Sequence, residues 1–311
     1  MQSATLNPDA LGQLLSPLEI TPTQIKQFHQ QGYFILDNLL TAKQIATIVE
    51  RFDSLFNTQF ETGASPDEWY GRPGVSQPNA TQQMTGLWRC DRTLASFTLS
   101  AKIAQLNASL MGWTSARYGL DTCWIKPPNA PEVYFHRNNT YTTAIAPPAT
   151  VTCWIALSDV AMETGSLEIV PGSHFWNCTD KIRVLHAPRE DYREPLWQAA
   201  KQAGVESPQI VPIVLPPGSA LFLHGNLWRG SGQNRSGSKT RRSLAISSLA
   251  GHARFQLPGM GDGYIFERYR QQGSLDLDES HYPILWSQDG YRTPFLADYC
   301  PDALVESDKQ A

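Results

Sequence analysis

Two short segments of this 311-residue chain carry side chains that can bind or transform an anionic small molecule. One holds His136, Arg137 and Asn138 in succession, and the other holds Arg229, with Arg241 about a dozen residues later. An arginine guanidinium stays protonated and can grip a carboxylate with two parallel hydrogen bonds. A histidine can act as a general base at neutral pH. The elements that position these residues can be read from the surrounding sequence.

The N-terminal part has the signals of two helices around a short strand. Thr21 is an N-cap before Pro22 at a first helical position, and Gly32 is a stop signal. Thr41 caps a second helix, whose apolar residues continue at helical spacing to Phe56. The apolar run YFILDNLL between the two helices has strand character. A helical layer is therefore expected to begin near residue 20.

The rest of this layer is predicted to contain a long loop and one more helix. Residues 60–85 are rich in Gly, Pro, Ser, Gln and Asn, which predicts a loop, and loops of that length are often functional. A further helix is expected over about 93–111.

Beyond residue 115 the pattern changes to short strands. The apolar runs are RYGLDTCWIK, TVTCWIALSDV, SLEIVP, QIVPIVLP, SALFLHGNLW and RRSLAISSL. They are rich in β-branched and aromatic residues, and Gly, Pro, Asn or Ser separates most of them, which favours a sandwich or closed barrel. A helix over 188–203 interrupts the series and ends at Gly204.

Composition sets limits on the protein class. Apolar residues make up 41% and charged residues 17% of the chain, which is typical of a globular protein. The net charge is -4 without a basic block, so nucleic acid is not an expected partner. No signal peptide or membrane span is indicated, and the five scattered cysteines predict free thiols in a reducing cytoplasm. We expect a cytoplasmic protein.

We predict one domain over residues 1–311. It consists of a helical layer over about 20–112, a β core over about 113–252 and a C-terminal extension over 253–311.

Four motifs in order closely resemble the phytanoyl-CoA dioxygenase family. They are the opening FHQQGYFILDNLL, then YFHRNNTY, then WIALSDV with ETGSL and VPGSH, and finally FLHGNLWRGSGQN followed by RRSLA. The resemblance spans roughly residues 21–250. It implies a mainly β fold with flanking helices, built on a double-stranded β-helix of the jelly-roll or cupin-like type. It also implies Fe(II) and 2-oxoglutarate as cofactors of an oxygenase.

In that family two histidines and a carboxylate hold the iron, and an arginine grips the distal carboxylate of 2-oxoglutarate. Matched position by position, the resemblance assigns these residues: His136 to the first histidine, Asn138 to the carboxylate, Arg229 to the second histidine, Arg241 to the 2-oxoglutarate arginine, and Trp154 and Ser231 to the cosubstrate pocket.

The residues at the metal positions depart from this pattern. An amide oxygen on Asn138 is a neutral ligand where a charged one is expected, and the Arg229 guanidinium has no lone pair to donate. His136 alone cannot hold iron, so weak or absent metal binding is predicted. As a hypothesis, Arg229 replaces the metal electrostatically, with Arg137 beside the site and Arg241 deeper in the barrel. The pocket would then bind an anion such as a 2-oxo acid.

Three functions remain open. The chain could be a working oxygenase that oxidises a small metabolite with an atypical metal site. It could be a metal-free enzyme in which His136 is a general base and Arg229 a second catalytic residue. It could also be a small-molecule binder or a partner subunit, in a homo-oligomer or together with a related active chain. We favour an iron-independent role.

The other histidines and Arg242 are not expected to take part in the site. His224 lies an odd number of residues before Arg229, so strand alternation sends the two side chains to opposite faces. By the same rule only one of Arg241 and Arg242 faces the interior, and the family resemblance implies that it is Arg241. His174 is expected to serve a turn or a helix start. The other histidines, His29, His186, His252 and His281, lie outside the motifs. Residues 88–92 are expected either to contact substrate or to form ion pairs.

Overall fold

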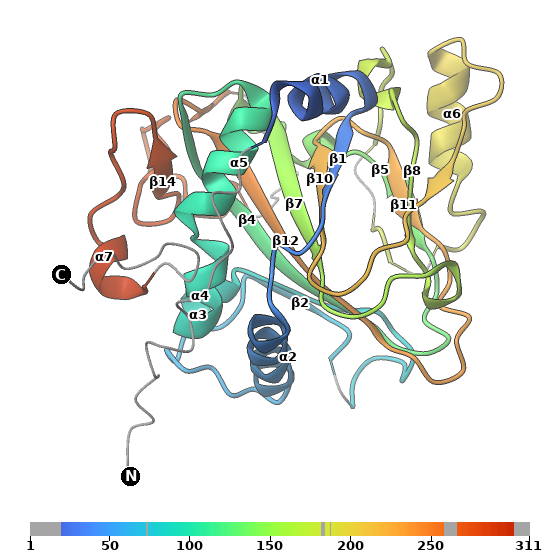
Figure 1. Cartoon of the computed structure of the whole chain (residues 1–311), viewed down its shortest axis with the longest axis horizontal. Coiled ribbons are helices and arrows are strands. Elements are labelled where there is room, and N and C mark those ends of the chain that lie inside the picture. The colour runs from blue at the N-terminus through green and yellow to red at the C-terminus, as the bar shows by residue number, and fades with distance from the viewer. Residues whose placement is uncertain (1–19, 73, 182–183, 187, 258–265, 302–311) are drawn as a thin grey trace.

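Two antiparallel sheets form the framework of the computed structural model (Figure 1), which describes residues 20–301 except 73, 182–183, 187 and 258–265. The major sheet has the strand order β1-β10-β7-β12-β4-β3-β2, with β14 also paired to β4. The minor sheet has the order β5-β11-β8-β9, and β6 pairs with β13 apart from both. The prediction of a mainly β fold with flanking helices is confirmed.

The strands have the following bounds. Those of the major sheet are β1 (Tyr33–Leu36), β2 (Glu68–Tyr70), β3 (Gln82–Thr85), β4 (Ser115–Lys126), β7 (Thr150–Ala156), β10 (Ala220–His224), β12 (Arg241–Ala250) and β14 (Ile284–Ser287). Those of the minor sheet are β5 (Val133–His136), β8 (Leu167–Ile169), β9 (Val211–Pro212) and β11 (Arg229–Ser231). The separate pair is β6 (Ile145–Ala146) and β13 (Arg254–Phe255).

The first two helices begin where their caps predict. Thr21 caps α1 (Pro22–Gln31) by accepting a hydrogen bond from the Gln24 amide, and Gly32 ends it at a φ of 79°. Thr41 caps α2 (Ala42–Phe56) in the same way. Positive φ is inexpensive only for glycine, so Gly32 is a true stop signal.

The helix predicted over 93–111 is in fact two helices, so that prediction is wrong in part. The chain forms α4 (Arg92–Thr98) and α5 (Ala101–Met111), preceded by the single turn α3 (Leu87–Cys90). The break occurs at Ser100, whose hydroxyl accepts hydrogen bonds from the amides of Lys102 and Ile103 and so starts a new helix. The later helices are α6 (Glu194–Gln202), which starts after the predicted residue 188, and α7 (Leu296–Tyr299).

The loop predicted over 60–85 contains two strands, which is a second correction. Residues Glu68–Thr85 include β2 and β3, which pair with each other and extend the edge of the major sheet beyond β4. Their flanking Gly, Pro and Asn residues give the segment a loop-like composition, and the two strands are too short to show alternation. This edge is where the segment contributes to the cavity described below.

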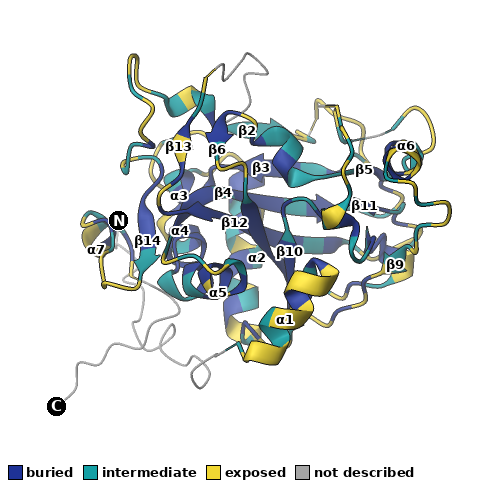
Figure 2. Ribbon diagram, turned by 90° about the horizontal axis from the view of Figure 1, so that it is seen from above, coloured by how far each residue is buried: buried dark blue, intermediate teal, exposed yellow. Residues whose placement is uncertain are grey.

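Alternation along the strands separates a helix-covered core from the interior between the sheets. On β7, Cys153 packs into the core with Phe28, Phe52 and other helix residues, whereas Thr152 and Trp154 face the interior. Figure 2 shows the central strands buried beneath helices whose outer faces are exposed. The interior is therefore lined by alternate residues of the long strands β4 and β7.

The C-terminal part is tied to the main sheet. The β14 strand pairs with β4, and the Arg117 guanidinium on β4 donates hydrogen bonds to the carbonyls of Gly251 and Leu277. Figure 1 shows β14 and α7 at the opposite end of the molecule from α6. The organisation into one domain stays a prediction.

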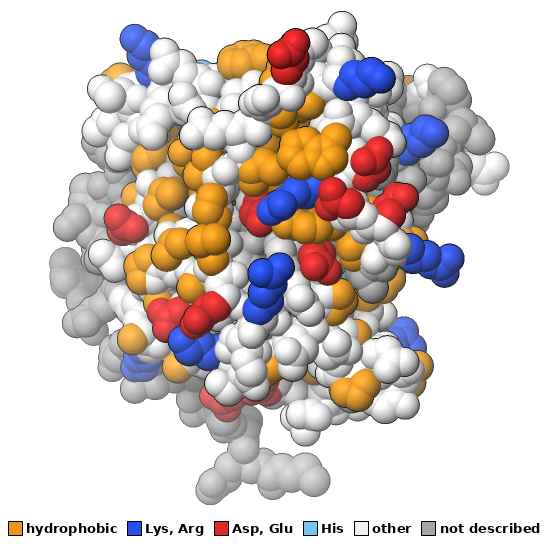
Figure 3. Space-filling view, turned by 90° about the vertical axis from the view of Figure 1, so that its right-hand side faces the viewer, with side chains coloured by type: hydrophobic (Ala, Val, Ile, Leu, Met, Phe, Trp, Pro, Cys, Tyr) orange, Lys and Arg blue, Asp and Glu red, His pale blue; other side chains and the backbone are white. Residues whose placement is uncertain are grey.

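Two further expectations from composition concern thiols and the surface. All five cysteines are free, as predicted. Within the described ranges no helix has the length and apolar character needed to cross a membrane. On the face seen in Figure 3, acidic and basic side chains are interspersed around apolar ones. The expectation that nucleic acid is not a partner stays a prediction.

Candidate functional site

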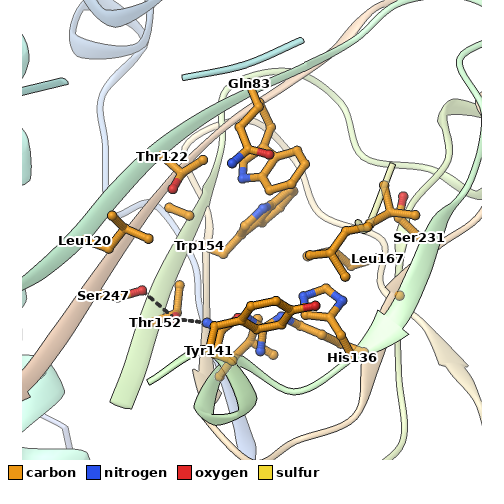
Figure 4. A pocket seen from close by; sticks show the side chains of 18 of the residues that line it. Gln83, Leu120, Thr122, His136, Tyr141, Thr152, Trp154, Leu167, Ser231 and Ser247 are labelled. Atoms are coloured by element: carbon orange, nitrogen blue, oxygen red, sulfur yellow. Dashed lines mark hydrogen bonds between the residues drawn. The ribbon is translucent and has the colours of Figure 1, made fainter. Parts of the chain in front are cut away.

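A cavity of about 520 Å³ lies between the two sheets. Figure 4 shows side chains of the major sheet, such as Trp154 and Ser247, meeting His136 and Ser231 of the minor sheet around one space. Six of the seven site residues predicted from the sequence line this cavity: His136, Asn138, Trp154, Arg229, Ser231 and Arg241. The resemblance therefore brings the right positions together, although their roles stay predictions.

His136 and Arg229 are direct cross-strand partners on β5 and β11. The Nδ1 atom of His136 lies 2.8 Å from the Tyr134 carbonyl oxygen. A carbonyl oxygen can only accept, so Nδ1 carries the hydrogen and the lone pair of the neutral ring is on Nε2. Directly opposite pairs have Cβ atoms about 5 Å apart, so the imidazole and the guanidinium share one part of the cavity wall.

Asn138 begins the 3₁₀ turn η2 (Asn138–Tyr141) after β5. Its Nδ2 donates a hydrogen bond of 2.9 Å to Thr152 Oγ1, which in turn lies 2.8 Å from Ser247 Oγ (Figure 4). The amide nitrogen is thereby turned toward the major sheet. Asn138, at the position that the resemblance assigns to a charged ligand, therefore forms an uncharged hydrogen-bond chain with Thr152 and Ser247.

Both arginines of the cavity are buried and lack full pairing. Arg229 is 6% exposed and Arg241 is 3% exposed. Among the described residues, none accepts a hydrogen bond from Arg229 Nη1 or from Arg241 Nε and Nη1. Burial lowers the pKa of each guanidinium to about 10, so both stay charged at neutral pH. Arg241 lies with its Cζ atom 5.5 Å from the centre of the Trp154 ring.

Ser231 is held by a lysine that the sequence analysis missed. Lys126 is fully buried, and its Nζ donates a hydrogen bond of 2.9 Å to Ser231 Oγ, which itself donates to the Gly165 carbonyl at 2.9 Å. Burial, followed by the charge of Arg241, lowers the pKa of Lys126 well below its ordinary value. Lys126 has the same parity on β4 as Trp124, which lines the cavity, so alternation along the strand was the available signal.

Arg137, which we predicted to bind the cofactor, lies outside the cavity. Its guanidinium lies 5.5 Å from the centre of the Trp228 ring and donates to the Cys178 carbonyl at 3.2 Å. It does not line the cavity, because it lies between His136 and Asn138 and therefore points to the other face of the strand.

His186 lines the cavity, although it lies outside all four motifs and was not expected to belong to the site. A single antiparallel bridge to Val133 on β5 brings its segment to the edge of the barrel. Its Nε2 lies 2.7 Å from Gln83 Oε1 on β3. No feature of the sequence near His186 indicates this placement, since it depends on a contact about fifty residues away.

The secondary candidates lie where alternation or pairing predicts. His224 is absent from the cavity lining and packs against His174 and Phe28, with ring centres 5.1 and 6.1 Å apart. His174 lies in the 3₁₀ turn η4 (Ser173–Phe175), as expected. Arg242 is also outside the lining.

The segment around residues 88–92 forms ion pairs. Arg89 is bound to Asp67, and Asp91 is bound to Arg51. None of these four residues lines the cavity, so the ion-pair alternative is confirmed.

The donor chemistry of the cavity does not fit an iron ion. The three positions that the resemblance assigns to ligands hold an imidazole, an amide and a guanidinium, and a guanidinium has no electron pair to give. Of the described lining residues, Glu68 alone carries a carboxylate, and it lies on the edge strand β2. Throughout the described ranges no three or more His, Cys, Asp or Glu side chains are grouped to hold a metal.

The two facing sheets with a cavity between them define a double-stranded β-helix, and solved structures confirm this fold. The non-heme alpha ketoglutarate dependent carbocyclase SnoK from nogalamycin biosynthesis matches with a TM-score of 0.67 and 20% identity, over 88% of this chain and 99% of that one. EctD from S. alaskensis matches with a TM-score of 0.63 and 20% identity, over 88% and 92%. EctD has been solved with bound Fe, and also with 2-oxoglutarate and 5-hydroxyectoine.

The chain belongs to the phytanoyl-CoA dioxygenase family, since the family model "Phytanoyl-CoA dioxygenase (PhyH)" matches residues 28–243, more than half of its length. A phytanoyl-CoA dioxygenase of Arabidopsis thaliana is 25% identical over 260 residues, covering 73% of this chain and 88% of that protein. The phytanoyl-CoA dioxygenase domain-containing protein 1 of Mus musculus is 22% identical over 276 residues, covering 77% and 94%.

Proposed function

We propose that this family member binds an anionic small molecule, a 2-oxo acid such as 2-oxoglutarate, through Arg229 and Arg241 without an iron ion. One observation carries the proposal: two buried guanidinium groups face one cavity with N–H groups that no described residue pairs. The anion would take the place that the metal and its cosubstrate share in iron-dependent relatives.

The physical reason is the free energy of a buried, unpaired charge. Such a charge costs several kcal/mol, and a partner of opposite sign with good hydrogen-bond geometry recovers much of it. Arg229 comes from the minor sheet and Arg241 from the major sheet, so a dicarboxylate offers one acidic group to each. A guanidinium holds a carboxylate with two parallel hydrogen bonds, which favours a 2-oxo dicarboxylate over a neutral ligand.

The residues beside the arginines set the chemistry available to the bound anion. The lone pair of neutral His136 lies on Nε2, and that ring shares the cavity wall with Arg229. In a metal-independent enzyme His136 would act as the general base, with Arg229 stabilising negative charge on the substrate. The same pocket also suits a binding subunit that assembles with copies of itself or with a related active chain.

Calorimetric titration of 2-oxoglutarate into protein dialysed against a chelator tests the proposal. We expect binding, and we expect Arg229→Gln and Arg241→Gln each to weaken it by more than tenfold, because each variant removes a charged two-pronged contact. Arg242→Gln is the matched control, since Arg242 lies outside the cavity on the same strand as Arg241. No binding at millimolar 2-oxoglutarate would contradict the proposal. Stoichiometric iron in the purified protein, with turnover of 2-oxoglutarate to succinate, would favour a working oxygenase instead.

A further inference from the structure

We infer that the same cavity holds a second, uncharged ligand with a planar ring system, which packs against the rings of Tyr70, His186 and Trp124. These three residues are called the ring ladder below. The inference rests on the proposed function in one respect, since it takes the two arginines to be occupied by the acid.

The ring ladder is a continuous wall of three aromatic rings. The ring centres of Tyr70 and His186 are 5.2 Å apart with an interplanar angle of 34°, and those of His186 and Trp124 are 5.2 Å apart with an angle of 37°. All three residues line the cavity. The wall closes the side between β3 and β4 of the major sheet and β5 of the minor sheet, because His186 is bridged to Val133 and hydrogen-bonded to Gln83.

The central ring of the ladder is uncharged and fixed in orientation. Gln83 Oε1 can only accept, so His186 Nε2 carries the hydrogen of their 2.7 Å bond. Burial, followed by the charge of Lys126, lowers the pKa of His186 to about 4. An imidazole that is neutral and held in place presents a fixed aromatic surface to a ligand rather than a charge.

The cavity is larger than the acid alone requires. At the roughly 30 Å³ that a water-sized group takes up in a liquid, the about ten non-hydrogen atoms of 2-oxoglutarate need on the order of 300 Å³. The cavity measures about 520 Å³, which leaves on the order of 200 Å³ for about one ring of a second molecule, and the rest of that molecule would lie toward the exposed Tyr70. Tyr70 is 43% exposed on the edge strand β2, whereas Trp124 is more buried and lies on β4, inside the sheet, so the ladder runs from the interior to the surface. A ligand can therefore reach it from solvent.

The charges around the ladder favour an uncharged ligand. Glu68, next but one to Tyr70 on β2, repels a second anion from this side of the cavity. The charge of Lys126, which contributes to the low pKa of His186, disfavours a cation beside the ladder. Leu120 and the buried Phe266 add apolar surface to the lining. Aromatic rings stack or meet edge to face with other rings more favourably than their buried area alone predicts, so a planar ring compound is the class that fits.

Paired titrations with 2-naphthol and its saturated counterpart trans-2-decalol test the inference, in the presence of saturating 2-oxoglutarate. Both probes are uncharged at pH 7 and similar in size, but only 2-naphthol has aromatic rings. We expect 2-naphthol to bind roughly twofold to tenfold more tightly, which is the advantage of one ring–ring contact. We expect Tyr70→Leu and Trp124→Leu to remove that advantage while leaving 2-oxoglutarate binding unchanged.

Phe175→Leu is the matched control, because Phe175 is 71% exposed and does not line the cavity. Tyr70 is itself partly exposed, so Tyr70→Leu keeps the test valid if Trp124→Leu does not fold. Equal binding of the two probes, no binding of either, or an aromatic preference that survives both ladder variants would overturn the inference. Tighter binding of the cationic 2-naphthylmethylamine would also overturn it. Failure of 2-oxoglutarate to bind on its own would instead refute the proposed function.

Discussion

Removing the charge of Arg229 is expected to stabilise the ligand-free protein and to weaken its binding of the acid. Burial lowers the pKa of Arg229 from 12.5 to about 10. A tenfold change in proton affinity is worth about 1.4 kcal/mol, so the charged form is disfavoured by about 3 kcal/mol in the folded state. Because the guanidinium is charged below pH 10 in both folded and unfolded chains, this cost is present at every neutral pH.

The Arg229→Met variant keeps most of the side-chain volume and removes the charge. Some packing and hydrogen-bond energy is lost with the guanidinium, so the net gain in the free energy of unfolding should be about 1–3 kcal/mol. In a chain of 311 residues that is a rise of about 2–5 °C in Tm, measured by calorimetry or circular dichroism without ligand. Adding 2-oxoglutarate at a hundred times the wild-type Kd should stabilise the wild type by about 2.7 kcal/mol, and it should stabilise a variant that binds more than tenfold less tightly by less than about 1.4 kcal/mol.

Arg242→Met is the control, because Arg242 is the neighbour of Arg241 on β12 but lies outside the cavity. It should change the ligand-induced rise in Tm by less than the error of the measurement. A fall in the Tm of ligand-free Arg229→Met by several degrees would refute the reasoning. It would mean that the guanidinium is already paired within the protein and does not need an anion.

Three other perturbations test separate parts of the account. The double variant Asn138→Asp, Arg229→His restores the metal ligands of the family. It should bind one Fe(II) or Mn(II) per chain in elemental analysis, whereas the wild type should not. Failure of the double variant to bind metal would mean that the cavity has diverged at more than these positions. Ser231→Ala removes the hydroxyl that accepts the Lys126 hydrogen bond at the cavity wall. It should weaken 2-oxoglutarate binding by about tenfold or more in calorimetry, and an unchanged Kd would contradict a role for Ser231 in binding. Burial lowers the pKa values of His186 and His224 to about 4, below the value of about 6.5 for the unfolded chain. As the pH drops from 6.5 to 4, the unfolded chain therefore binds protons that the folded protein does not, and the free energy of unfolding should fall. Each histidine should contribute about 2–3 kcal/mol to that fall in urea titrations, and His224→Gln should remove its share; a stability that is flat over this range would contradict the buried, neutral assignment.

Strand alternation predicted much of the site from sequence alone. It separates Arg241 from Arg242 and His224 from Arg229, and the family resemblance selects Arg241 as the inward one of the first pair. The structure places all four side chains accordingly. The same rule argues against Arg137 as a cavity residue, because it lies between His136 and Asn138, whose side chains both line the cavity. It also points to Lys126 once Trp124 is known to face the cavity. A period of two is reliable here because one face of each strand is buried under helices and the other faces the cavity.

Features that depend on contacts distant in sequence were not predictable in this way. The β2 and β3 strands form because the edge of β4 offers unpaired backbone groups, and nothing in their own composition signals it. His186 reaches the cavity through a single bridge to Val133. The break at Ser100 has a local signal, since serine is a preferred N-cap residue, but the prediction of one helix over 93–111 did not use it.

The central claim is that the cavity binds an acid through two arginines and needs no metal. The most direct measurement is the Kd of 2-oxoglutarate for one protein preparation, determined by calorimetry after dialysis against a chelator and again after addition of excess Mn(II). The account predicts the same Kd in both titrations. Binding that appears only when the metal is present would contradict it.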